Sequence, residues 1–257
     1  MNLTQEWDKI FPQSDKVTHR KVTFKNRYGI TLAADLYMPK EAVQSGLPAL
    51  AISGPYGAVK EQASGLYAQT MAERGYVTVA FDPSFTGESS GVTAEDGQEV
   101  RFIASPEINT EDFSAAVDFL GLQPQVDRNR IGVIGICGFG GFALNATAVD
   151  KRIKAVATTS MYDMSRVSAK GYFDSMTTEQ RSAALEAMSQ QRWADAEAGE
   201  AALSGLGLPN ELSGQEPQFV AEYFDFYKTP RGFHPRSINS NGSFPSTNAL
   251  PLMNMPL

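Results

Sequence analysis

The residues best suited to chemistry in this sequence surround its single cysteine, in the stretch GICGFGG at 135–141. An apolar run at 131–134 precedes this stretch, and a helix-like segment at 142–149 follows it. A strand, a sharp turn flanked by glycines and a helix are typical of a nucleophile elbow, which holds a reactive side chain on a strained backbone. Cys137 stands where this motif usually has serine, so the pattern predicts a nucleophilic thiol.

This placement supports attack of the sulfur on a carbonyl carbon. The partial positive charge at the start of the predicted helix favours the thiolate, which is the attacking form of cysteine. The N–H group of Gly138 would face the oxyanion that develops during the attack. A second donor usually comes from the loop after an earlier strand. Here that loop is 53–57, and the N–H group of Tyr56 is the candidate donor.

The chain has two histidines that could act as a base, and neither lies where the base of such a nucleophile usually stands. His19 lies in the first predicted strand, far from the elbow in sequence, which favours a structural role. His234 lies in a loop, and Asp163 follows the strand predicted after the elbow. The order Cys137, Asp163, His234 is that of a nucleophile, an acid and a base. His234 is either that base or a structural or substrate-contacting residue, and we favour the second alternative.

Four charged residues have both a catalytic and a structural interpretation. Glu61 and Glu88 could approach the thiol, although such carboxylates more often cap helices or pair with arginine. Arg231 and Arg236 could bind a substrate carboxylate through paired hydrogen bonds, or they could be solvated. Both alternatives stay open for each pair at this point.

Three other interpretations of the glycine-rich stretch compete with a nucleophile. Cys137 could be a small buried apolar residue, or a thiol that senses oxidants. The glycines could bind a dinucleotide, but their spacing is not G-x-G-x-x-G, and no acidic residue ends a second strand about 20 residues later. We therefore favour the nucleophile.

Composition and charge restrict the partners of the protein. Its 257 residues can bury the core of one large α/β domain. The net charge is −7 without a basic cluster, so we expect neither nucleic acid nor a membrane as partner. One cysteine excludes an internal disulfide and a cysteine-based metal cluster, and we expect no metal and no cofactor. No secretory signal or membrane-spanning run is visible, which predicts a cytoplasmic protein.

The hydrophobic pattern predicts the elements that must position these side chains. Strands are expected at 17–25 and 30–37, as an antiparallel hairpin, and then at 49–52, 76–81, 131–136 and 153–159. Helices are expected at 62–74, 109–120 and 142–149. This alternation predicts a mostly parallel sheet with helices on both faces.

The alternation stops after residue 160. Thr177 and Gln180 form a predicted capping box, which opens a helix to about residue 203 with Leu185, Met188 and Trp193 on its buried side. A short aromatic helix follows at 217–227, which is consistent with an apolar substrate or with packing of a cap. We divide the chain into a core at 1–164, a helical cap at 165–236 and an irregular C-terminal tail at 237–257.

Four segments in this order make the chain similar to the α/β-hydrolase superfamily, and within it to dienelactone-hydrolase-like members with cysteine in the elbow. They are 53–57 with 60–62, then 80–89, 109–113 and the elbow itself. The resemblance covers residues 17–160 and implies the α/β-hydrolase fold. It also implies hydrolysis of a small ester, lactone or thioester through an acyl-enzyme, with Cys137 as nucleophile and Gly138 and Tyr56 as oxyanion donors.

The sequence departs from that family after the sixth predicted strand. The family places its acid after a seventh strand and its histidine after an eighth, and neither strand is recognisable here, so the resemblance transfers neither residue. We expect the sixth strand to form an open edge of the sheet, which the tail or a second copy of the chain could cover. Two functions stay open. The first is a hydrolase whose activity depends on the acid and the histidine that the resemblance does not place, and the second is a non-catalytic protein of this fold that binds a ligand or another subunit.

Overall fold

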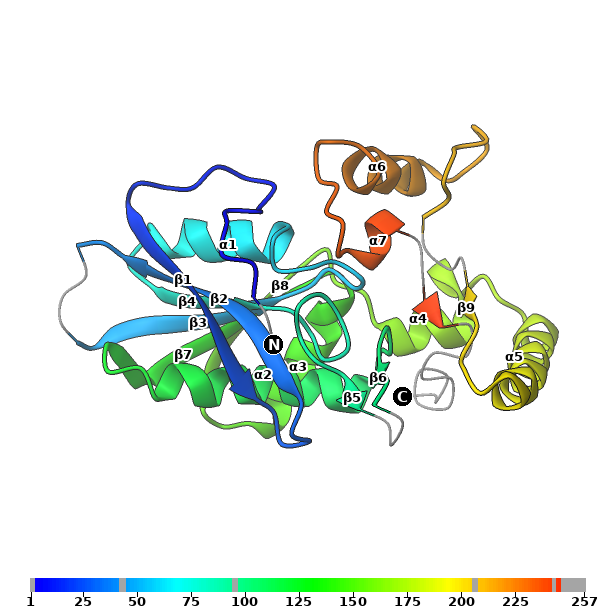
Figure 1. Cartoon of the computed structure of the whole chain (residues 1–257), viewed down its shortest axis with the longest axis horizontal. Helices are drawn as coiled ribbons and strands as arrows, with labels where there is room; N and C mark the ends of the chain where they lie inside the picture. The colour runs from blue at the N-terminus through cyan, green and yellow to red at the C-terminus, as the bar shows by residue number, and fades with distance from the viewer. Residues whose placement is uncertain (1–2, 42–44, 94–96, 205–207, 242–243, 246–257) are drawn as a thin grey trace.

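The computed structural model describes residues 3–41, 45–93, 97–204, 208–241 and 244–245. Figure 1 shows a twisted sheet with helices on both faces, and a second group of helices beside it. This second group contains α4 (Met164–Lys170), α5 (Thr178–Ala198), α6 (Gln218–Tyr227) and α7 (Ile238–Asn241). Within the described residues, no helix combines the length and the apolar character that crossing a membrane requires.

The main sheet has the predicted mixed topology. Its strands are β1 (Val17–Lys25), β2 (Thr31–Pro39), β3 (Leu47–Ser53), β4 (Val77–Phe81), β7 (Val126–Ile136) and β8 (Ile153–Thr159), in the order β1-β2-β4-β3-β7-β8. The β1–β2 hairpin and the β2–β4 pair are antiparallel, and the pairs from β4 through β3 and β7 to β8 are parallel. The expected hairpin and parallel sheet are therefore confirmed.

Helices cover both faces of this sheet and produce two cores. On one face, α1 (Ala63–Ala72) packs Ala68 against Ile52 of β3. On the other face, α2 (Pro106–Gly121) and α3 (Gly138–Val149) pack around Phe81 of β4, with Phe113 contributed by α2 (Figure 1). Every residue of β4 is buried, which explains why the central strands are apolar runs without alternation.

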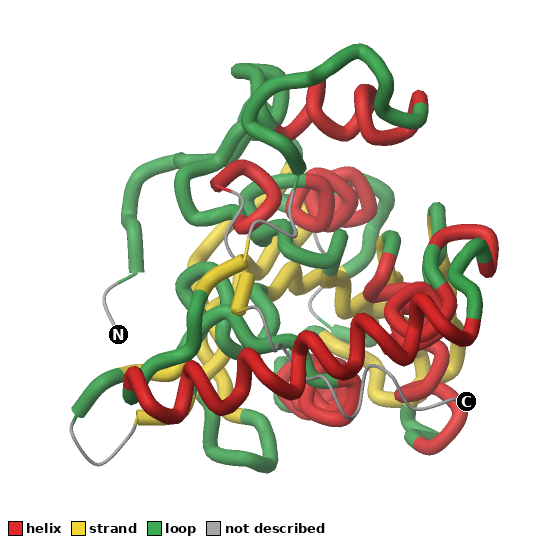
Figure 2. The backbone as a smooth tube through the Cα atoms, turned by 90° about the vertical axis from the view of Figure 1, so that its right-hand side faces the viewer, coloured by secondary structure: helices red, strands yellow, loops and turns green. Residues whose placement is uncertain are grey.

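Several boundaries differ from the prediction. The α2 helix begins three residues early, because Ser105 accepts a hydrogen bond from the N–H of Ile108 and Pro106 occupies the first turn. The capping box of α5 is confirmed, but the helix ends at Ala198, where Gly199 adopts φ 77°. No residue of α5 is fully buried, but Leu185 and Met188 are half-buried, as expected of an inward side. Trp193 is 68% exposed, so its predicted place on the buried side was wrong. Figure 2 shows this long helix crossing the outside of the molecule.

Short elements were missed because two to seven residues carry little periodicity. They include the β5 (Val92–Thr93) and β6 (Glu99–Val100) pair, the β9 (Leu203–Ser204) and β10 (Phe244–Pro245) pair, the 3₁₀ turn η1 (Tyr172–Asp174), and α4. The α7 helix lies where an irregular tail was expected, and residues 246–257 of that tail lie outside the described residues. The division into core, cap and tail stays a prediction.

The β8 strand forms one edge of the sheet in the described part of the chain, with β7 as its partner there. Its side chains at Ala155, Ala157 and Thr158 are exposed. The absence of two further strands, and pairing of this edge with a second copy, stay predictions.

A buried cluster of charges lies beneath the loop that follows β3. The Nζ atom of Lys60 lies 2.6 Å from Glu61 Oε1, 2.8 Å from Asp82 Oδ2 and 2.7 Å from Glu88 Oε2, and the Lys60 side chain is fully buried. These three carboxylates are close enough together to hold a metal ion, but the ammonium group already lies among them. Burial lowers the pKa of Lys60, but the surrounding carboxylates outweigh it and hold the pKa well above its ordinary value.

The variant Lys60→Met should lower the free energy of unfolding by about 3–5 kcal/mol, because it removes the cation that pairs with the fully buried carboxylate of Asp82. Denaturant unfolding followed by circular dichroism measures the change. The matched control is Lys154→Met on β8, an exposed lysine, which should change stability by less than about 0.5 kcal/mol. Equal losses in the two variants would contradict a structural role for the cluster.

Candidate active site

Cys137 lies at the bend between β7 and α3, on a strained backbone with φ 56° and ψ −127°. Non-glycine residues rarely adopt such a conformation, and it persists only where neighbouring contacts fix it. Here the Cys137 N–H donates to Thr159 O at 2.9 Å, and the Cys137 carbonyl accepts from the N–H groups of Gly140 and Tyr162 at 2.9 and 3.1 Å. The backbone of the predicted elbow is therefore present.

Both predicted donors face the sulfur. The main-chain N–H groups of Gly138 and Tyr56 lie close enough to the Cys137 sulfur to stabilise its thiolate and to lower the pKa of the thiol. The first donor comes from the start of α3, and the second comes from the loop after β3. The structure thus brings together three residues that the sequence singled out, although 81 positions separate Tyr56 from Cys137 along the chain.

Two glycines allow the loop and the elbow to approach so closely. A Cβ atom on Gly138 would lie 3.0 Å from Tyr56 Cβ and 2.6 Å from Met164 Cγ. A Cβ atom on Gly54 would lie 2.3 Å from the carbonyl oxygen of Ile136, which is backbone and cannot move aside. Close contact between these segments therefore requires residues without a side chain.

The thiol itself is less acidic than the sequence suggested. Burial raises the pKa of Cys137, and the N–H groups of Gly138 and Tyr56 offset this only in part, so the pKa is above its ordinary value. The N–H group of Gly138 at the helix N-terminus lowers the pKa, as expected, but the sequence did not show that burial outweighs it. A raised pKa also weighs against an oxidant sensor, because such thiols have low pKa values.

Three tyrosines of the chain after β8 lie within electrostatic range of the sulfur. A negative charge on Cys137 raises the pKa values of Tyr172, Tyr223 and Tyr227, which places all three near the thiol. The Tyr223 hydroxyl lies 3.2 Å from that of Tyr162. Burial is the largest cause of the raised pKa of each of the three, so these groups keep their protons at neutral pH and can donate hydrogen bonds.

The contacts of the predicted acid and base are with groups other than the thiol. Asp163 caps α4, where its side chain accepts from the N–H of Arg166 at 2.9 Å. His234 is buried, its Nδ1 accepts from the N–H of Arg236 at 3.3 Å, and its Nε2 lies 4.0 Å from Asp8 Oδ2. Burial lowers the pKa of His234. These contacts are structural and give no support to a Cys137, Asp163, His234 triad.

The structural alternative also fits the other charged candidates. His19 Nε2 lies 2.7 Å from Asp35 Oδ1. Arg231 pairs at the surface with Asp225 at 2.7 Å. Arg236 reaches Glu61 at 3.0 Å and also pairs with Asp8, so it is engaged by carboxylates of the protein. Burial raises the pKa of Glu61, but Lys60, Arg236 and Lys21 outweigh it and lower the pKa to about 2.

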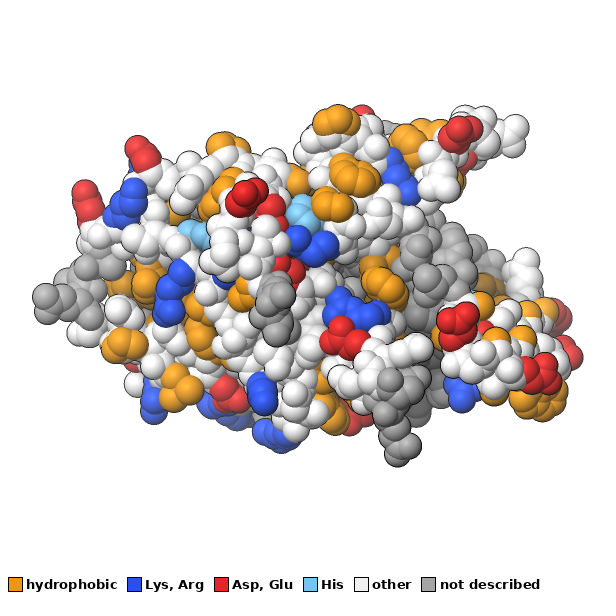
Figure 3. Space-filling view, viewed as in Figure 1, with side chains coloured by type: hydrophobic (Ala, Val, Ile, Leu, Met, Phe, Trp, Pro, Cys, Tyr) orange, Lys and Arg blue, Asp and Glu red, His pale blue; other side chains and the backbone are white. Residues whose placement is uncertain are grey.

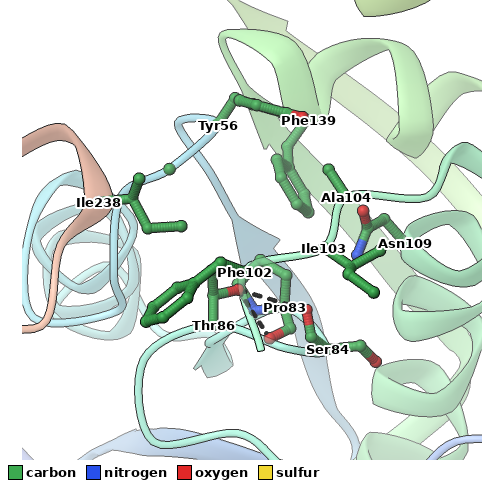
Figure 4. Close-up of a pocket in the computed structure, with 11 residues that line it drawn as sticks. Tyr56, Pro83, Ser84, Thr86, Phe102, Ile103, Ala104, Asn109, Phe139 and Ile238 are labelled. Atoms are coloured by element: carbon green, nitrogen blue, oxygen red, sulfur yellow. Dashed lines mark hydrogen bonds between the residues drawn. The ribbon is translucent and has the colours of Figure 1, made fainter. Parts of the chain in front are cut away.

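A small cavity of about 20 Å³ adjoins the elbow, which is room for about one water molecule. Figure 4 shows Tyr56 and Phe139 on one side of this cavity and Ile238 and Phe102 on another. Ile238 comes from α7, and the sequence pattern did not point to this segment. A segment close to the end of the described chain therefore helps to enclose the space beside the Tyr56 loop.

Comparison with known proteins identifies the family. A profile of the X-Pro dipeptidyl-peptidase (S15) family matches residues 28–231. The chain belongs to this family. The chain is 63% identical over 257 residues to Uncharacterized protein PA2218 of Pseudomonas aeruginosa. The match covers all of this chain and 67% of that protein. The crystal structure of PA2218 superimposes with a TM-score of 0.93, at 64% identity, over 100% of this chain and 77% of that one.

More distant relatives share the fold. The α/β hydrolase GrgF from Penicillium superimposes with a TM-score of 0.69 at 21% identity, over 93% of this chain and 73% of that one, which confirms the α/β-hydrolase fold. Thiohydrolase aneE of Aspergillus aculeatus is 32% identical over 143 residues, which are 56% of this chain and 42% of that protein. The resemblance to α/β hydrolases predicted from four segments is thus confirmed at the level of the superfamily.

The variant Gly54→Ala should be about 1–3 kcal/mol less stable than Gly75→Ala, because its Cβ atom would collide with the elbow. Both glycines have a similar strained φ, 101° and 96°, but nothing lies within 4 Å of a Cβ atom at Gly75. The backbone strain of an alanine at positive φ costs about 1–2 kcal/mol in both variants. The difference in stability between the two, measured by thermal unfolding, therefore reports the collision of the Gly54→Ala Cβ atom with the elbow. Equal stability would mean that the loop and elbow do not need this close approach.

Alkylation of Cys137 by iodoacetamide should accelerate with pH and continue to rise past pH 9, because burial raises the thiol pKa above its ordinary value of 9.0. The chain has one cysteine, so the measured rate reports this thiol alone. The urea-unfolded chain is the control and should react faster at pH 8. A plateau below pH 8 in the native protein would contradict the raised pKa.

Proposed function

We propose that this protein cleaves small activated acyl compounds, thioesters above all, through an acyl-enzyme on Cys137. The observation that carries the proposal is the pair of N–H groups, from Gly138 and Tyr56, that face one sulfur at a strained elbow. Such a pair stabilises the oxyanion of a tetrahedral intermediate. The name of the relative aneE, a thiohydrolase, is consistent with this chemistry.

In the proposed reaction, the Cys137 thiol first loses its proton to solvent. The thiolate attacks the acyl carbon, a C–S bond forms, and the carbonyl electrons move to the oxygen that faces the two amides. Collapse of this intermediate expels the leaving thiolate. Water then attacks the acyl-enzyme, which releases a carboxylic acid and restores the Cys137 thiol.

Thioesters are favoured over peptides by their leaving group. A departing amine must receive a proton from a positioned acid. Among the described residues, the two histidines are held by other partners, near Asp35 and near Asp8. A departing thiol has a pKa of about 8.5 and leaves as the thiolate without this help. Tyr172 and Tyr223, which lie within electrostatic range of Cys137, both pack against Phe219, and this aromatic cluster suits an apolar acyl group.

Incubation with an S-acetyl thioester of N-acetylcysteamine should place one acetyl group on Cys137, detected by mass spectrometry of the intact protein. The variant Cys137→Ala should show none, and Ala-Pro-p-nitroanilide should remain uncleaved by the wild-type protein. Circular dichroism confirms equal folding. Absence of the adduct on folded wild-type protein, or its persistence in Cys137→Ala, would refute the proposed function.

A further inference from the structure

The loop that carries Tyr56 is held by a segment from near the end of the described chain. The Asn239 side chain donates from Nδ2 to the carbonyl oxygen of Tyr56 at 2.8 Å. The Asn239 main-chain N–H donates to the carbonyl oxygen of Gly57 at 3.1 Å, and Ser237 Oγ donates to the same oxygen at 3.1 Å. Two successive carbonyl groups of the loop are therefore bound by one short segment, and Asn239 contacts both.

These carbonyls belong to a tight turn at residues 55–58. The N–H of Ala58 donates to Pro55 O at 3.0 Å, and Gly57 has φ 77° while Tyr56 has no positive φ, which is the pattern of a type II turn. The turn bond points the Pro55 carbonyl inward. Because a trans peptide is planar, the Tyr56 N–H of the same peptide points out of the turn, toward Cys137. The turn sets the direction of this N–H group, and external contacts set its position.

We infer that Asn239 is a positioning residue that holds the Tyr56 N–H group on the sulfur of Cys137. This inference rests on the proposed function and names the contact on which one of its two oxyanion donors depends. Asn239 touches neither the sulfur nor the substrate in this assignment. It acts through the Tyr56 turn.

The same asparagine links the turn to the aromatic cap. The Asn239 side chain lies close enough to the side chain of Tyr227 to lower the pKa of this tyrosine, which is 6% exposed at the end of α6. Tyr227 lies within electrostatic range of Cys137. The position of the Tyr56 N–H group therefore depends, through Asn239, on the position of α6. An acyl group that packs against α6 would affect the positions of α6 and of this N–H group together.

The test uses two variants, Asn239→Asp, which keeps the shape of the side chain but replaces the Nδ2 donor, and Asn239→Ala. Both are compared with Asn241→Ala as the matched control. Asn241 is a neighbouring asparagine whose side chain bonds to Pro235 O and not to the turn. Two readouts are the Cys137 pKa, from the pH dependence of alkylation, and kcat and KM for the acetyl thioester. Both Asn239 variants should raise the thiol pKa and lower kcat about 10- to 100-fold with little change in KM, since complete loss of one oxyanion donor costs about 10²–10³-fold. The control should match the wild type.

An unchanged thiol pKa in both Asn239 variants would overturn the inference, even if they melt at lower temperature. An unchanged kcat would do the same. Failure of the wild-type protein to form an acyl adduct would refute the proposed function instead, and the thiol pKa would still report whether Asn239 positions the Tyr56 N–H group.

Discussion

The buried ammonium group of Lys60 is the interaction on which the arrangement of the site depends. It lies within 2.8 Å of carboxylates from Glu61, Asp82 and Glu88, and Lys60 also donates its main-chain N–H to Asp82 Oδ1 at 2.7 Å. Asp82 directly follows β4, and Lys60 ends the loop that carries Tyr56. An unpaired charge at this depth would cost several kcal/mol, so the loop is anchored to the sheet by a strong electrostatic constraint.

Arg236 extends this cluster to both ends of the described chain. It contacts Glu61 at 3.0 Å, pairs with Asp8, and donates to Thr4 Oγ1 at 3.2 Å. Gln62 Nε2 adds a hydrogen bond of 2.6 Å to the carbonyl of Gly232. The segment at 232–239 therefore contacts the loop after β3 at two places. Arg236 and Gly232 contact it at Glu61 and Gln62, and Ser237 and Asn239 contact it at Tyr56 and Gly57.

The surroundings of Cys137 combine two opposing effects. Burial disfavours the thiolate, whereas two amides stabilise negative charge at the same place. In the proposed function, the amides that partly stabilise the thiolate would also stabilise the carbonyl oxygen, which carries charge only during the reaction. A raised pKa leaves only a small fraction of the thiol ionised at neutral pH, and the proposed substrates are therefore acyl compounds with good leaving groups.

The sequence by itself determined the sheet, its hairpin, the elbow and the Gly138 amide, because each depends on local periodicity or on a glycine-flanked turn. It named the Tyr56 amide as a candidate, and only the tertiary structure places that amide beside the sulfur. It also marked Lys60 and Glu61 as part of a resemblance, without showing that their charges pair. Only the tertiary structure decided the roles of Asp163 and His234, since a carboxylate near the elbow in chain order can still serve as a helix cap. The contact between Asn239 and Tyr56 joins residues 183 positions apart, and no periodic pattern encodes such a contact. The thiol pKa was likewise decided by burial, since Cys137 packs against a core cluster built from distant segments, among them Ile52 of β3 and Ala68 of α1.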